Sequence, residues 1–139
     1  MSEEVTLSED ANRALQEAQN FCFRANVAIV AADHLLAGAL AVLADGGDTA
    51  VPTRAALEAA LMLTQASGDA ALTNQVMYGS SARDAINDTA RRLREVGGSV
   101  IDARTIALGT IDSGEVNPMF YGSLGIAKAA LRAAIEGTA

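Results

Sequence analysis

An internal repeat constrains this chain more than any other feature of its sequence. When the sequence is shifted by 71 residues, the segment 11–40 aligns with 82–111 without a gap. A duplicated unit buries its apolar face against its copy, and two copies close into a globule with pseudo-twofold symmetry rather than a solenoid. We therefore predict one globular domain with a first repeat (1–66), a linker (67–77) and a second repeat (78–139). Matched pairs include Leu15 with Ile86, Leu35 with Ile106 and Gly38 with Gly109.

Helices are the expected elements of each repeat. Half of the 139 residues are hydrophobic, with many alanines, no tryptophan and two prolines, which favours packed helices over sheets. Ser8 is a suitable N-cap, and the glycine pairs at 46–47 and 97–98 are C-cap signals. Apolar spacing predicts helices from Ser8 onward, over 33–44, after Pro52, over 80–96, over 103–111 and, beyond a short turn that follows Pro118, through Ile135.

The same spacing predicts which side chains face the core. The helix over 33–44 is apolar nearly all round, so we expect it to be the buried helix of its half. The other predicted inward residues are Ala11, Leu15, Ala18 and Cys22, then Ala56, Leu57, Ala60 and Leu61, then Ala82, Ala85, Ile86, Thr89, Leu93 and Val96, then Ile106, Ala107 and Leu108, and finally Ile126, Ala130, Leu131 and Ile135.

The charge balance excludes two classes of partner. Ten basic and seventeen acidic residues give a net charge of −7, and such a field repels nucleic acid and anionic membranes. The most apolar stretch, 27–43, is too short and too polar to span a bilayer. The acidic first ten residues do not form a secretory signal, and a lone Cys22 fits a reducing compartment. We expect a cytoplasmic location.

Two motifs resemble those of a known family. Leu7–Ala18 reads L-S-E-D-A-N-R-A-L-x-x-A and Ala31–Leu40 reads A-A-D-H-L-L-A-G-A-L. With their spacer, they resemble the first repeat of the Clp N-terminal domain found in ClpC- and ClpA-type ATPases, and 78–86, 100–109 and 124–131 resemble the second repeat. The resemblance implies an all-α fold of roughly seven to eight helices related by a pseudo-twofold. The chain departs from the family between Leu43 and Ala55, where a short helix is expected to be reduced or lost.

The residue inventory argues against an enzyme. The only lysine, Lys128, follows an alanine, so the chain contains no Gly-Lys-Ser/Thr phosphate loop. We expect Cys22 to be a small core residue and His34 a hydrogen-bonded residue at a helix start, which is a stronger interpretation than a nucleophile–base pair. One Cys and one His cannot form a closed zinc site. We therefore predict no catalytic residue, metal or cofactor.

The resemblance implies binding instead. Domains of the ClpC type are associated with adaptor proteins, unfolded substrates, phosphoarginine-tagged proteins and cyclic-peptide antibiotics. The family's phosphoarginine positions correspond to Ser8 and Asp33 in the first repeat and to Gly79 and Arg104 in the second, so at most one such site is expected. Ser8 as a plain N-cap is the competing interpretation. Tyr78 corresponds to an aromatic residue that packs on peptide ligands, or it is an ordinary core tyrosine.

One basic cluster, Arg91, Arg92 and Arg94, has two interpretations. Asp88 and Glu95 lie at helical spacing from it, which favours an ion-paired solvent face over a docking patch for an acidic partner.

These patterns together predict a non-catalytic module that binds peptides and proteins and resembles the substrate- and adaptor-recognition domain of Clp unfoldases. As a stand-alone protein it would act as a decoy that captures Clp ligands such as peptide antibiotics or tagged substrates. The expected partners are peptides, adaptor proteins, cyclic-peptide ligands and a Clp ATPase, with no nucleic acid and no membrane. The alternative is a structural module that docks to a Clp complex and has no peptide site.

Overall fold

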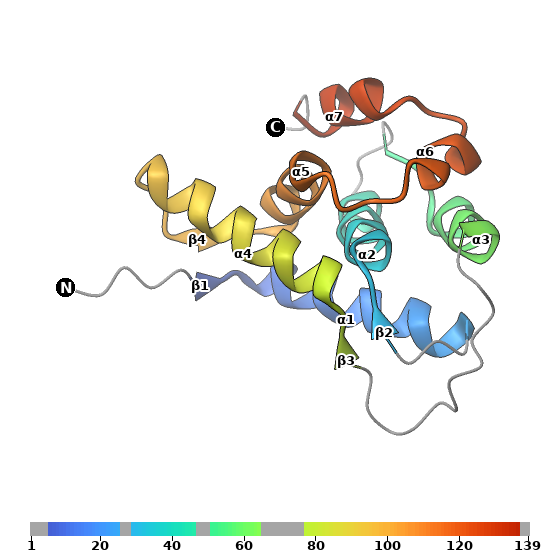
Figure 1. Ribbon diagram of the computed structural model, residues 1–139, viewed down its shortest axis with the longest axis horizontal. Helices are drawn as coiled ribbons and strands as arrows, with labels where there is room; N and C mark the ends of the chain where they lie inside the picture. Colours follow the sequence, from blue (N-terminus) through green and yellow to red (C-terminus); the bar gives the residue numbers. More distant parts are fainter. Residues whose placement is uncertain (1–5, 26–28, 47–50, 65–76, 137–139) are drawn as a thin grey trace.

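A computed structural model describes residues 6–25, 29–46, 51–64 and 77–136. This part of the chain is predominantly helical, as predicted, and Figure 1 shows its helices gathered around α2. None of the helices in these ranges is long and apolar enough to cross a membrane. The elements are β1 (Thr6–Leu7), α1 (Glu9–Ala25), β2 (Ile29–Val30), α2 (Ala32–Asp45), α3 (Arg54–Thr64), β3 (Met77–Tyr78), α4 (Ser80–Glu95), β4 (Val100–Ile101), α5 (Ala103–Ser113), α6 (Pro118–Leu124) and α7 (Lys128–Glu136).

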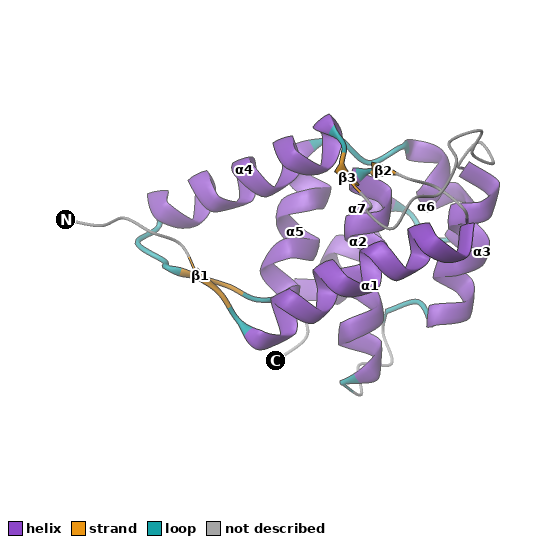
Figure 2. Cartoon of the chain, turned by 90° about the horizontal axis from the view of Figure 1, so that it is seen from below, coloured by secondary structure: helices purple, strands orange, loops and turns teal. Residues whose placement is uncertain are grey.

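The sequence repeat is visible in the element boundaries. A shift of 71 residues places β1 on β3, α1 on α4, β2 on β4 and the start of α2 on the start of α5. The strands pair in parallel across the repeats, β1 with β4 and β2 with β3. Figure 2 shows the two pairs at separate places, with β1 beside the start of α1. The two repeats are therefore tied together at two equivalent points, which the sequence pattern did not predict.

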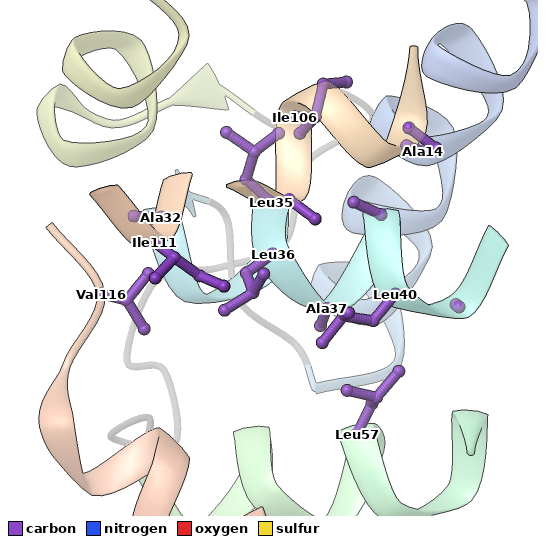
Figure 3. Packing of buried hydrophobic residues seen from close by; sticks show 14 of the residues in the cluster. Ala14, Ala32, Leu35, Leu36, Ala37, Leu40, Leu57, Ile106, Ile111 and Val116 are labelled. Atoms are coloured by element: carbon purple, nitrogen blue, oxygen red, sulfur yellow. The ribbon is translucent and has the colours of Figure 1, made fainter. Parts of the chain in front are cut away.

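Helix α2 forms the centre of the core, as its apolar composition predicted. Every side chain from Ala32 to Val42 is buried. Figure 3 shows Leu35, Leu36 and Leu40 of α2 surrounded by residues of the neighbouring helices. The crossing of α1 and α2 is close because Gly38 has no side chain: a Cβ there would lie 2.8 Å from the backbone nitrogen of Ala18. Glycine at this position sets the distance between the two helices.

The second repeat is packed less tightly at the end of α4. Leu93 is half-buried and Val96, the residue after α4, is 80% exposed. The prediction that Val96 faces the core is wrong, because α4 extends beyond the body of helices at its C-terminal end (Figure 1). Ala56 and Ala130 are exposed as well, at the edges of faces whose neighbours Leu57 and Leu131 are buried.

Helix α6 corrects a second prediction, since a short turn was expected after Pro118. The Asn117 side chain accepts a hydrogen bond from the Met119 N–H at 3.0 Å, and Pro118 occupies the first helical position. Both residues are favoured at helix starts. In the first repeat, α2 ends at Asp45 and α3 begins at Arg54, and residues 47–50 between them lie outside the described part. Of the predicted linker, 67–76 lies outside it too, while Met77 begins β3.

Candidate functional site

The strand pairs bring the predicted site residues into two groups that differ from the predicted ones. At the first junction, β1 pairs with β4, and Ser8 donates its backbone N–H to the Ile101 carbonyl at 2.9 Å. The helix carrying Arg104 begins beside this pair. At the second junction, β2 pairs with β3, and the Gly79 N–H donates to the Val30 carbonyl at 2.8 Å, just before Asp33. Ser8 of the first repeat therefore lies beside the start of the helix that carries Arg104 of the second repeat. Gly79 of the second repeat lies close to Asp33 of the first.

Ser8 at the first junction is a helix cap, as its sequence context predicted. The Ala11 N–H donates to Ser8 Oγ at 3.2 Å, and the Ser8 hydroxyl donates to the Asp10 carboxylate. The hydroxyl thus satisfies one of the free N–H groups at the start of α1.

Arg104 at the same junction serves the C-terminus of another helix. Its Nε donates to the Ile135 carbonyl at 3.2 Å and its Nη2 to the Glu136 carbonyl at 2.7 Å. A cation at this position stabilises the negative end of α7. The guanidinium is therefore already bonded to the protein's own backbone.

Asp33 at the second junction connects two helix starts. Its side chain is 4% exposed, and Oδ1 accepts a hydrogen bond from the Asn117 N–H at 2.9 Å. Next to it, the Ala32 N–H donates to Ser81 Oγ at 3.0 Å, which links α2 to α4. The carboxylate therefore holds α6 against α2 and is screened from solvent.

His34 lies beside Asp33 and is fully buried. Its Nδ1 accepts a hydrogen bond from the Ala31 N–H at 3.0 Å, as expected of a histidine at a helix start. An acceptor nitrogen requires the neutral ring, and burial lowers the pKa of His34 to about 4. The ring is thus uncharged at neutral pH.

Tyr78, another predicted binding residue at the second junction, is more accessible than the buried Asp33. Its ring is half-buried against Ala18, Cys22, Val30 and Ala82. Its hydroxyl accepts a hydrogen bond from Gln19 Nε2 at 3.0 Å. Both interpretations of Tyr78 are therefore compatible with its place, since one side packs on the core and the rest is open.

Two further residues, which the sequence analysis missed, extend this area. Phe23 lies one helical turn after Gln19 and is 39% exposed, and Ile29 of β2 is 53% exposed. Gly79 lies against Ile29, because a Cβ there would come within 2.7 Å of Ile29 Cγ2. We call Gln19, Phe23, Ile29, Tyr78 and Gly79 the Tyr78 surface. The sequence signal for Phe23 was an aromatic residue outside the apolar stripe of α1.

Comparisons with known proteins show which fold this geometry resembles. No family model matches the chain, and no curated protein matches it. Among solved structures, it is similar to the crystal structure of the N-terminal domain of the caseinolytic protease associated chaperone ClpD from Arabidopsis thaliana, with a TM-score of 0.72, 20% sequence identity and 94% of each chain covered. The chain has the Clp N-domain fold. The fold implied by the sequence motifs is thereby confirmed.

Within this Clp N-domain fold, the lone cysteine and histidine do not form a nucleophile pair. The Cys22 thiol is buried, lies 3.7 Å from the Ile29 carbonyl, and burial raises its pKa to about 12. A thiol with such a pKa is not a nucleophile at neutral pH. The described ranges hold no group of three or more His, Cys, Asp or Glu side chains arranged to bind a metal.

The basic cluster on α4 is mostly ion-paired, as its spacing favoured. Arg91 and Arg92 both contact the Asp88 carboxylate and lower its pKa, and Arg91 also contacts Glu95. Arg94 has no ion-pair partner among the described residues. A groove of about 440 Å³ between α4, α5 and α7 is lined by Arg92 and Arg132, but both are paired with carboxylates, so it offers no free charge.

Proposed function

We propose that this protein is a non-catalytic module that binds peptide segments through the Tyr78 surface. The observation that carries the proposal is an accessible apolar area at the β2–β3 junction of the Clp N-domain fold. Phe23 and Ile29 supply exposed apolar side chains, and the Tyr78 hydroxyl with Gln19 supplies hydrogen-bonding groups. An amphipathic aromatic residue flanked by apolar ones is the usual composition of a peptide-contact area.

The ligand is proposed to be apolar or aromatic rather than phosphoarginine. A guanidinium would have to reach the carboxylate of Asp33, which is 4% exposed and already accepts the Asn117 N–H. Opening the packing around this buried, hydrogen-bonded group costs about 1–3 kcal/mol. Ser8 and Arg104 are bonded within the protein at the other junction. This supports cyclic or linear peptides and adaptor segments as ligands.

Calorimetric titration with a cyclic-peptide Clp inhibitor tests the proposal. Tyr78→Ala should abolish binding, and Tyr78→Phe, which removes only the hydroxyl bonded to Gln19, should weaken it by no more than about tenfold. Met119→Ala is the matched control, because Met119 is 62% exposed on α6 and lies outside the Tyr78 surface. Binding that is unchanged in Tyr78→Ala would refute the site.

A decoy role is the finer proposal. The protein would then compete with the N-domain of a Clp unfoldase for the same peptide. In a fluorescence competition assay, wild-type protein should displace the peptide from that N-domain, while Tyr78→Ala should not.

A docking module for a Clp complex is the second candidate. The observation in its favour is that the predicted polar groups Ser8, Asp33 and Arg104 are all bonded within the protein. This second function predicts no heat of binding when the protein is titrated with the cyclic peptide. It also predicts that the protein sediments together with a Clp hexamer.

A further inference from the structure

The groove between the second half of α4, α5 and α7 has a volume of about 440 Å³. Its apolar lining comes from Leu93 and Val96 at the end of α4 and from Leu108 of α5. Leu93 and Leu108 are half-buried. Val96 is 80% exposed, which makes it the most exposed large apolar side chain in the part of the chain that the structure describes. Apolar surface that stays open and has polar residues around it is typical of a contact site.

The same space in the first repeat is closed. Four of the residues that line the groove are at least partly exposed, while their counterparts 71 residues earlier are all buried. The pairs are Arg92 with Phe21, Leu93 with Cys22, Thr105 with His34 and Leu108 with Ala37. What is interior packing between α1 and α2 is therefore open surface between α4 and α5.

The side chain of Thr89 explains why the second repeat stays open. Its counterpart Ala18 has a small side chain, and the backbone of α1 comes close to Gly38 of α2. At Gly109, the counterpart of Gly38, an added Cβ would meet the Thr89 side chain instead of backbone. Thr89 thus lies between α4 and α5, and beyond it α4 projects from the body of helices (Figure 1). The groove is a consequence of this crossing.

The charged side chains of the groove are balanced, unlike those of the whole chain. Two are basic, Arg92 and Arg132, and two are acidic, Glu95 and Asp112. Each of the four is ion-paired within the chain. Because the chain has a net charge of −7, two copies repel each other over much of their surface, and a neutral face is where they can approach. A strongly acidic or basic partner would find no free charge in this lining.

We propose that the groove is a contact between two copies of this chain. The projecting end of α4 in one copy, with Val96, enters the groove of the other copy. The reverse contact is identical, because a twofold interface uses the same self-complementary surface on both sides. Apolar side chains together with charges of both signs fit such a surface. The groove lies at the opposite end of α4 from Tyr78, so the dimer does not rest on the proposed function.

Sedimentation equilibrium of the whole chain over a range of protein concentrations tests the dimer. The measured mass should rise from that of one chain towards that of two, with a Kd of about 0.1 mM, as expected of a small interface. Val96→Asp should weaken the dimer at least about tenfold, because each contact would bury an unpaired carboxylate. Its melting temperature should equal that of the wild type, since Val96 is exposed.

Met119→Asp is the matched control for Val96→Asp. It adds the same charge at a side chain that is 62% exposed on α6 and does not line the groove. This variant should dimerise like the wild type. A weakening equal to that of Val96→Asp would show an effect of net charge alone and would overturn the proposal.

Two further measurements locate the contact and test its charge balance. When ¹⁵N-labelled protein is diluted, the amide shifts of Leu93, Val96 and Gly109 should change, while that of Tyr78 should not. Added salt should strengthen the dimer, because it screens the repulsion between two chains of net charge −7. The ion pairs of the groove lie within each chain, so their screening does not separate the copies.

Three other results would overturn the proposal. A mass of one chain at concentrations up to about 1 mM, well above the expected Kd, would show that no second copy fills the groove. Equal dimerisation of wild type and Val96→Asp, or dilution shifts confined to other helices, would show that the copies meet elsewhere. A dimer weakened by salt would show that opposite charges hold the copies together. Each result is independent of the cyclic-peptide titration at Tyr78.

Discussion

Replacing Gly38 with alanine should separate the two helices at the centre of the first repeat. The added Cβ would lie 2.8 Å from the backbone nitrogen of Ala18 and closer still to the carbonyl oxygen of Ala14. Both neighbours are backbone atoms of α1, so no side chain can rotate away. Ordinary contact begins at 3.4 Å. The Ala18 nitrogen alone requires α1 to shift by about 0.6 Å, and the closer Ala14 oxygen requires a larger shift, in a close-packed interior.

The expected cost exceeds the gain from helix propensity. Overpacking costs about 1–3 kcal/mol where side chains adjust and more where the backbone must move, whereas Gly to Ala in a helix gains about 1 kcal/mol. We expect a net loss of about 3 kcal/mol in the free energy of unfolding, measured by urea denaturation at neutral pH. Gly122→Ala is the matched control: Gly122 lies within α6 with nothing within 4 Å of its added Cβ. That variant should be as stable as the wild type or more so. A Gly38→Ala protein with unchanged stability would refute the close crossing of α1 and α2.

Four further predictions follow from single contacts. Gly109→Ala should be destabilising alone and rescued by Thr89→Ala, because its Cβ would meet the Thr89 side chain rather than backbone; urea denaturation of the single and double variants measures the coupling. His34 has a pKa of about 4 instead of 6.5, so the unfolded chain binds the proton more readily. Stability from this residue is complete above about pH 6.5 and falls as the pH drops towards 4, by about 2–3 kcal/mol at the acid end of this range; the difference in unfolding free energy between wild type and His34→Gln should follow this curve. The Cys22 thiol should resist a thiol reagent at pH 8 until urea unfolds the protein, because its pKa is about 12; labelling of the native protein would contradict its burial. Arg104→Gln should cost about 1 kcal/mol and speed amide hydrogen exchange in the last turn of α7, because two carbonyl contacts are lost.

The helices and their core faces were predictable because they depend on local spacing. Two of the signals act within one helix: Ser8 at the start of α1 and the apolar run of α2. The repeat at 71 residues relates matched helices of the two halves. Helix α6 was missed although Asn117 and Pro118 are helix-start signals, since its seven residues are too few to show a period. Strands of two residues carry no alternation at all.

The sequence offered candidate site residues one by one, but it did not predict how the structure arranges them in space. Ser8 and Asp33 were paired because they share a repeat, yet the strands join opposite repeats, so Ser8 lies by β4 and Asp33 near β3. That choice is a long-range one that local sequence does not encode. The contacts that occupy Asp33 and Arg104 come from Asn117 and from the end of α7, both distant in sequence.

An NMR titration tests the central claim, that the Tyr78 surface captures peptides, most directly. The ¹⁵N-labelled protein would be titrated with the cyclic-peptide inhibitor, and the shifted amides would be mapped on the structure. The account predicts that the largest shifts cluster at Gln19, Phe23, Ile29, Tyr78 and Gly79. Saturable shifts confined to other helices, or no shifts in a protein that melts cooperatively, would contradict it.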